Sequence, residues 1–196
     1  INLIVNKSNI KYKKQLSTCV ELKVDFIITS LGSPKEVIDK CKPADIKVFC
    51  DVVDLKFALK VAELGADAVI AVNSSAGGHA GNMTAEELVP LLKRKLDIPI
   101  ISAGGIATND QLKKALDIGA DAASIGTLFI ASKEASVSEE YKNALVQYSA
   151  KDIVMTSNIS GTPITVINTP YMKKYGNKQG TMSRILSRNK RFKKYI

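Results

Sequence analysis

Residues 64–72 read Leu-Gly-Ala-Asp-Ala-Val-Ile-Ala-Val, and residues 118–125 repeat the pattern as Ile-Gly-Ala-Asp-Ala-Ala-Ser-Ile. In each copy a glycine follows an amphipathic segment, and an apolar run begins soon after it. Glycine adopts the left-handed conformation that ends many helices, and a short apolar run indicates a buried strand. Each copy therefore predicts a helix that passes directly into a strand.

The same alternation of strand and helix extends over most of the chain. We predict apolar strands at residues 1–5, 26–29, 47–53, 68–72, 98–102 and 122–125. We predict helices at residues 9–22, 35–42, 55–64, 84–96, 110–118 and 138–148. Thr84 and Glu87 form a capping box, and Ser138 caps the last helix. Because the strands are apolar throughout, we expect them to be parallel and buried on both faces.

The fold class indicated is α/β, and the direct joints favour a TIM-type (β/α)8 barrel. A doubly wound sheet is the alternative, but it usually has one glycine-rich turn, and this chain has three. A full barrel needs eight βα units in roughly 250 residues, whereas six are found here. The chain also begins with Ile1, inside a strand. We therefore expect a barrel that lacks its first two βα units, with end strands that do not pair.

The net charge of +9 is concentrated at one end of the chain. Residues 171–196 hold nine basic residues and no acidic one, while residues 1–170 hold nineteen of each sign. Four apolar residues are interleaved with the basic ones: Met182, Ile185, Leu186 and Phe192. We therefore expect residues 1–170 to form the partial barrel and residues 171–196 to pack on it. A nucleic-acid-binding tail is the less favoured interpretation.

The remaining composition points to a cytoplasmic protein. No run of 18 apolar residues and no signal-peptide pattern is present, so no membrane association is expected. The three cysteines, Cys19, Cys41 and Cys50, are too widely spaced for a metal-ligand pair or a disulfide framework. We predict free, buried thiols in a reducing compartment.

Three small-residue turns follow successive strands and suggest one shared site at the carboxyl ends of the strands. Gly104-Gly105 and Gly126-Thr127 end the last two strands. Glycine lets the backbone approach an anion closely and adopt positive φ, and the Thr127 hydroxyl adds a donor. The pair predicts a phosphate site, with tight-turn packing as the alternative.

The third turn, Ala76-Gly77-Gly78-His79-Ala80-Gly81, contains the only histidine of the chain. In a glycine loop at the expected working face, His79 has few neighbours to pack against, which favours a proton-transfer role. A metal site is not expected because there is no second histidine. Residues 152–161 are predicted to form a polar loop that covers a ligand or simply lies on the surface.

These turns resemble the nitronate monooxygenase family, formerly called 2-nitropropane dioxygenases. The resemblance rests on residues 65–70, 76–81, 100–106, 119–122 and 125–127, and it extends over the whole chain. The flavin-dependent enoyl-acyl-carrier-protein reductases of the same superfamily share the pattern. There are two departures: Ser75 replaces the usual acid, and the family's first two strands, which help to hold the isoalloxazine ring, have no counterpart here.

The resemblance implies an FMN-dependent oxidoreductase that converts alkyl nitronates to carbonyl compounds and nitrite with O2. It implies that His79 is the active-site histidine. It also implies the following cofactor-binding residues: Gly77, Gly78, Gly104, Gly105, Ser124, Ile125, Gly126 and Thr127. A nitronate or nitroalkane is the expected small-molecule partner, a homodimer is one expected assembly, and no nucleic acid is expected. The alternatives are an NAD(P)H-dependent flavin enoyl-acyl-carrier-protein reductase and an inactive phosphate-ligand-binding barrel fragment.

Overall fold

The computed structural model describes residues 1–6, 9–158 and 163–175, with only the backbone of Tyr175. The chain divides into two compact units. We call Ile1–Ser75 with Gly81–Ser124 the sheet unit, and Ala76–Ala80 with the chain from Ile125 onward the hairpin unit. The loop that contains His79 therefore leaves the sheet unit after Ser75 and belongs to the hairpin unit.

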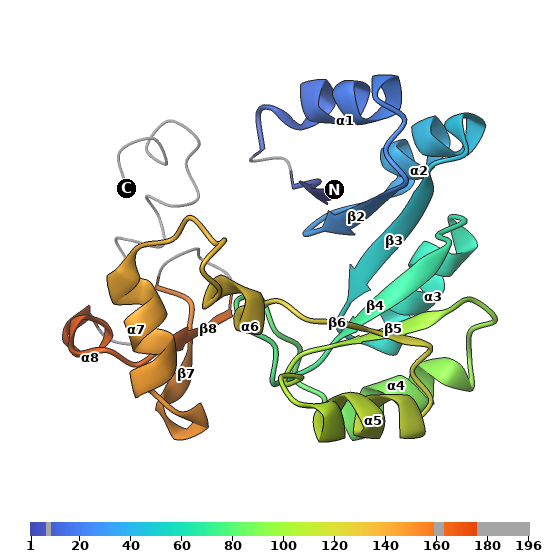
Figure 1. Cartoon of the computed structure of the whole chain (residues 1–196). Coiled ribbons are helices and arrows are strands. Elements are labelled where there is room, and N and C mark those ends of the chain that lie inside the picture. The colour runs from blue at the N-terminus through green and yellow to red at the C-terminus, as the bar shows by residue number, and fades with distance from the viewer. Residues whose placement is uncertain (7–8, 159–162, 176–196) are drawn as a thin grey trace. The chain divides into compact units, whose positions relative to one another are not determined.

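The sheet unit contains one parallel six-stranded sheet in which the strands follow chain order. The strands are β1 (Asn2–Ile4), β2 (Phe26–Ser30), β3 (Lys47–Val52), β4 (Ala68–Val72), β5 (Ile100–Ala103) and β6 (Ala122–Ser124). The helices are α1 (Tyr12–Glu21), α2 (Lys35–Cys41) with the 3-10 turn η1 (Lys42–Ala44), α3 (Leu55–Glu63), α4 (Ala85–Lys93) and α5 (Asn109–Asp117). Figure 1 shows these helices along the convex side of the curved sheet.

The strand order decides between the two expected architectures. A doubly wound sheet reverses its strand order at a switch point and has helices on both faces. Here the order is sequential from β1 to β6, and the two outer strands do not pair with each other within the described residues. The prediction of a partial (β/α)8 barrel is confirmed, including its unpaired end strands.

The hydrophobic core lies between the sheet and its helices. Buried strand residues pack against buried helix residues, and the largest fully buried side chains include Leu16, Ile27, Leu88, Leu92 and Ile100. Strand β4 is buried along almost its whole length, as predicted. Strands β1 and β3 instead alternate between buried and more exposed residues. Every second side chain of these strands points to the concave face of the sheet, and six strands do not enclose that face.

The repeated Gly-Ala-Asp pattern has the same structural role in both copies. Gly65 and Gly119 have φ values of 94° and 106°, so each ends its helix in the left-handed region as predicted. The aspartates that follow accept backbone hydrogen bonds at 2.8 Å, Asp67 from the Val48 N–H and Asp121 from the Ile100 N–H. Each pattern therefore also ties the strand it begins to the preceding strand of the sheet.

The hairpin unit is smaller and contains one antiparallel strand pair. Its elements are α6 (Thr127–Ile130), α7 (Glu139–Gln147), η2 (Ala150–Asp152), β7 (Ile153–Thr156), β8 (Ile164–Ile167) and α8 (Pro170–Tyr175). Ser138 caps α7 as predicted, because its side chain accepts from the Tyr141 N–H. The short helix α6 was not predicted.

The prediction of a polar loop at residues 152–161 is wrong for residues 153–156. Residues 153–156 form β7, which pairs with β8 in the register Ile153↔Ile167. A four-residue run of Ile-Val-Met-Thr has the β-branched character of a strand, but a strand this short needs a partner to form. Residues 159–161 of that loop, and residues 176–196 of the basic segment, lie outside the described residues. The described part of the basic segment, residues 171–175, belongs to α8, in which Met172 is buried.

Candidate functional site

The Gly104-Gly105 turn directly follows β5 in the sheet unit. Both glycines have positive φ, 118° and 73°, as the sequence predicted. A Cβ on Gly105 would lie 2.9 Å from the Cβ of Ser75, so this position excludes any larger residue without movement. The turn thus depends on glycine twice, once for its conformation and once for space.

Asn73, the first residue after β4, holds this turn in place. Its side-chain amide donates to the Gly104 carbonyl at 3.1 Å, and its Oδ1 accepts from the Ser75 N–H at 2.8 Å. The side chain is 1% exposed, so both contacts are protected from water. Asn73 was not among the predicted site residues, although a polar residue directly after an apolar strand is a visible signal in the sequence.

A second polar cluster occupies the carboxyl ends of β2 and β3 on the concave face. The Ser30 hydroxyl lies 2.5 Å from Asp51 Oδ2 and 3.3 Å from Asn2 Oδ1. Because a hydroxyl has one proton, it donates to the nearer oxygen, that of the carboxylate. The signal for this cluster was a carboxylate interrupting the apolar run Val48–Val52, and it was overlooked.

The Gly77-Gly78-His79 segment is part of the hairpin unit and lies beside two residues that are distant in the sequence, Thr127 and Thr165. The Thr165 N–H donates to the Gly78 carbonyl at 2.7 Å, which forms an isolated antiparallel bridge between the loop and β8. A Cβ on Gly77 would lie 2.9 Å from the Thr127 Oγ1. Gly78 has a φ of 74°. Gly77 therefore lies close to Thr127, and His79 follows the two glycines with an exposed side chain.

The Gly126-Thr127 turn differs from the expected one in its backbone. Gly126 has a φ of −119° and a ψ of −63°, so the positive φ expected there is not present. A Cβ at Gly126 would meet nothing within 4 Å. The helix that follows, α6, has only four residues, so its aligned peptide dipoles add little positive charge. An anion at this turn would therefore be bound by the backbone N–H groups of the turn and would gain little from the helix dipole.

The amides of both turns are available to a ligand. Among the described residues, none accepts a hydrogen bond from the N–H of Gly105, Gly126 or Thr127. All three residues are exposed. Free, exposed amides in glycine turns are the donors that a phosphate group uses. Each turn taken by itself therefore offers donors that fit an anionic group: Gly105 in the sheet unit, and Gly126 and Thr127 in the hairpin unit.

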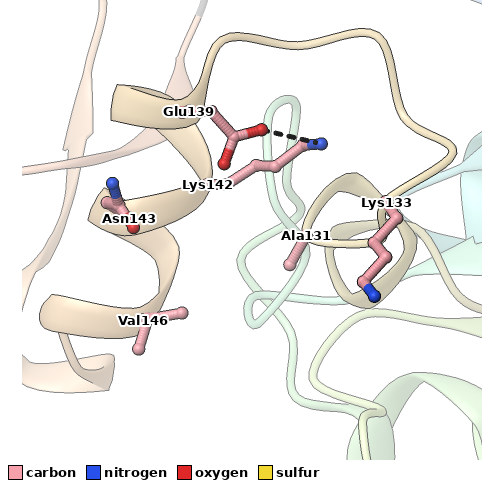
Figure 2. Close-up of a pocket in the computed structure, with 6 residues that line it drawn as sticks. All are labelled: Ala131, Lys133, Glu139, Lys142, Asn143 and Val146. Carbon is pink, nitrogen blue, oxygen red and sulfur yellow. Dashed lines mark ion pairs between the residues drawn. The ribbon is translucent and has the colours of Figure 1, made fainter.

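A pocket of about 320 Å³ lies within the hairpin unit, and Figure 2 shows the residues that line it. Its lining comes from α7 and from the segment between α6 and α7: Ala131, Lys133, Glu139, Lys142, Asn143 and Val146. Lys142 pairs with Glu139 at 3.3 Å, and the Glu139 side chain is 77% exposed. None of the sequence-predicted site residues lines this cavity, so it is separate from the glycine turns.

The cysteines have no part in a reactive site. All three are free and buried, as predicted. Burial raises the pKa of Cys50 to about 11, which keeps it a neutral thiol at physiological pH. Within the described ranges there is no group of three or more His, Cys, Asp or Glu residues that could hold a metal ion. The described helices include none with the length and apolar character needed to cross a membrane.

Two solved structures share the fold of this chain over most of its length. FabK from Thermotoga maritima matches with a TM-score of 0.83 and 36% identity, over 88% of this chain and 55% of that one. A nitroalkane oxidase from Streptomyces ansochromogenes matches with a TM-score of 0.79 and 27% identity, over 84% of this chain and 51% of that one.

Comparison of sequences identifies the family. A probable nitronate monooxygenase of Staphylococcus saprophyticus is 31% identical over 176 residues, which is 84% of this chain and 50% of that protein. A nitronate monooxygenase of Paraburkholderia phytofirmans is 33% identical over 156 residues, which is 74% of this chain and 43% of that protein. This chain thus spans about half the length of the relatives it matches. The model of the family described as nitronate monooxygenase matches residues 2–194, and the chain therefore belongs to the nitronate monooxygenase family.

Proposed function

We propose that this chain is the flavin-binding part of an FMN-dependent oxidoreductase that converts alkyl nitronates to carbonyl compounds and nitrite with O2. Membership of the nitronate monooxygenase family supports the reaction class. Proteins of this family are flavoproteins. Bound FMN supplies the redox chemistry, and the protein supplies binding, orientation and proton transfer.

The observation that carries the proposal is the His79 loop. The His79 side chain is exposed, and the preceding Gly78 carbonyl accepts a hydrogen bond from the Thr165 N–H. An exposed imidazole on an anchored loop supports a role in exchanging protons with a small molecule. A neutral nitroalkane must lose a proton from carbon before it becomes a nitronate, and His79 is the base we assign to that step. A nitronate that is already an anion needs no such base.

The cofactor-binding residues remain those expected from the family resemblance. We propose that Gly104, Gly105, Gly126 and Thr127 bind the FMN phosphate, through backbone N–H groups of the two turns and through the Thr127 hydroxyl. The positive φ values of the first two glycines and the absence of acceptors for three of the amides support this assignment. In this proposal Ser124 and Ile125 line the strand end that carries the Gly126-Thr127 turn. Gly77 and Gly78 lie along the cofactor.

A flavin-dependent enoyl-acyl-carrier-protein reductase is the second candidate, and one observation favours it. The identity to FabK, a flavin enoyl-acyl-carrier-protein reductase, is 36%, which exceeds the 27% identity to the nitroalkane oxidase. Such an enzyme takes its electrons from NAD(P)H. The two candidates therefore differ in which electron donor reduces the flavin.

The test is anaerobic reduction of the purified protein loaded with FMN. We expect propyl nitronate to bleach the visible flavin absorbance and NADPH to leave it unchanged. Bleaching by NADPH, with turnover of an enoyl thioester, would favour the reductase. Failure to bind FMN at all would contradict both enzymes and leave the phosphate-ligand-binding fragment.

The role of His79 is tested separately with His79→Asn. We expect turnover of neutral nitroalkane to fall by about 10²–10⁴-fold, because proton abstraction loses its base. Turnover of pre-formed nitronate is the internal control and should change little. Equal loss on both substrates, or no loss on either, would contradict the base assignment.

A further inference from the structure

We propose that Thr165 is a positioning residue for His79, and that its hydroxyl and amide together fix the peptide that carries the histidine. This inference rests on the function proposed above for His79. Thr165 lies on β8, 87 residues from Gly78 in the sequence. No pattern in the sequence joins the two.

The contacts are concentrated on two carbonyls of the loop. The Thr165 N–H donates to the Gly78 carbonyl at 2.7 Å. The Thr165 Oγ1 lies 2.6 Å from the Ala76 carbonyl and 3.2 Å from the Gly78 carbonyl. Since the hydroxyl has one proton, it donates chiefly to the Ala76 carbonyl, which is the nearer of the two.

The Gly78 carbonyl is part of the peptide bond between Gly78 and His79. That peptide is planar, so a hydrogen bond that fixes its carbonyl also fixes the direction of the His79 N–Cα bond. The Ala76 carbonyl fixes the other end of the same segment. The only freely rotating residues between the two fixed carbonyls are Gly77 and Gly78.

A pair of glycines needs such an anchor more than other residues do. Glycine has the largest choice of backbone conformations, and Gly78 is held at a φ of 74°. Without the two contacts, the segment would sample many conformations, and the imidazole of His79 would move with it. Displacements of about 1 Å can cost about 100-fold in rate when reacting groups must meet.

The anchor itself is on a regular element. Thr165 pairs with Met155 in the antiparallel ladder of β7 and β8, which runs over four residue pairs. A side chain on a paired strand is held more firmly than one on a loop. Thr165 is therefore suited to orient the loop without touching the reacting atoms.

The test compares Thr165→Val with Thr165→Ser in the FMN-loaded protein. Valine keeps the branched shape and the backbone N–H but removes the hydroxyl, whereas serine keeps the hydroxyl. We expect Thr165→Val to lower kcat on neutral nitroalkane by about tenfold, with little change in KM and in turnover of pre-formed nitronate. We expect Thr165→Ser to restore most of the wild-type rate.

A second measurement does not depend on the cofactor or on activity. The backbone ¹⁵N heteronuclear NOE of Gly77, Gly78 and His79 in the apo protein should fall in Thr165→Val and stay near wild type in Thr165→Ser. Thr29→Val is the matched control, because it removes a hydroxyl that bonds the Phe49 carbonyl and Cys50 in the sheet unit. This control should leave both the NOE and the substrate preference unchanged.

The outcomes separate this inference from the function on which it rests. Wild-type NOE and wild-type nitroalkane turnover in Thr165→Val would overturn the positioning role. Equal loss on nitroalkane and nitronate would also overturn it, because that pattern indicates a general structural defect. If His79→Asn has no effect on nitroalkane turnover, the proposed base is wrong, while the NOE still decides whether Thr165 orders the loop.

Discussion

Replacement of Gly105 by alanine tests whether the turn after β5 depends on glycine for structural reasons. The residue has a φ of 73°, a conformation that costs an L-amino acid about 1–2 kcal/mol. The new Cβ would also meet the Ser75 Cβ at 2.9 Å, closer than carbon atoms pack. Relief of that contact requires backbone movement, for which about 1 kcal/mol is a reasonable cost. We expect Gly105→Ala to lower the free energy of unfolding by about 2–3 kcal/mol in total.

The assay is urea unfolding followed by far-UV circular dichroism, with Gly126→Ala as the matched control. Gly126 has a negative φ and open space around its Cβ position. Its replacement should change the free energy of unfolding by no more than about 1 kcal/mol, and any gain would come from a less flexible unfolded chain. Both glycines were predicted to act alike, so the structure makes a distinction that the sequence did not.

A double variant divides the expected loss at Gly105 into its two causes. Ser75→Gly removes the atom against which the new Cβ would press, and its own effect is measured alone. Combined with Gly105→Ala, it should recover the steric part of the loss and leave the backbone part, so that the two changes are not additive. Wild-type stability of Gly105→Ala, or full additivity of the pair, would refute this reasoning.

Two further predictions concern the other glycine turn and the repeated joint. Gly126→Val should keep the fold but weaken FMN binding at least about tenfold, because a branched side chain beside free amides prevents the close approach of an anion. Fluorescence titration measures the affinity for FMN. An unchanged affinity would show that this turn is not part of the phosphate site. The Ile100 N–H and the Lys93 ammonium hold the pKa of Asp121 below its ordinary value of 3.8. A lowered carboxyl pKa stabilises the fold above the unfolded-state pKa, and this contribution disappears as the pH falls through the folded-state value. Asp121→Asn should therefore lower the free energy of unfolding by about 0.5–1 kcal/mol at pH 7, a small loss because the site is partly exposed. At a pH below the folded-state pKa of Asp121, the loss should be small. Urea unfolding measures both values, and an equal loss at the two pH values would contradict the linkage.

The sequence by itself determined the sheet unit, because the signals there are local. Apolar runs and amphipathic segments alternate with a period that each element carries within its own residues. Helix ends are equally local, since Thr84 caps α4 through an amide only three residues away. Gly65 and Gly119 end their helices by their own backbone conformation. These features could be predicted without knowledge of any distant part of the chain.

The candidate site could be predicted only in part for the same reason. The glycines and His79 were visible because small residues at strand ends form a local pattern. Asn73 and Asp51 were not recognised, since their partners are 31 and 21 residues away. A polar residue after or within a strand has no assigned role until the neighbouring strand is in place. Strand register, which the whole sheet sets, decides which side chains meet.

Only the tertiary structure decided how the His79 loop is held. Strand β7 is four residues long and forms by pairing with β8, so its local composition alone left it ambiguous. That hairpin then presents Thr165 to carbonyls that lie 87 and 89 residues earlier in the chain. Hydrogen bonds between backbone groups carry no side-chain signature, because every residue except proline offers the same N–H and C=O. Contacts of this kind depend on where the fold brings two segments together, and the order of residues along the chain does not encode them locally.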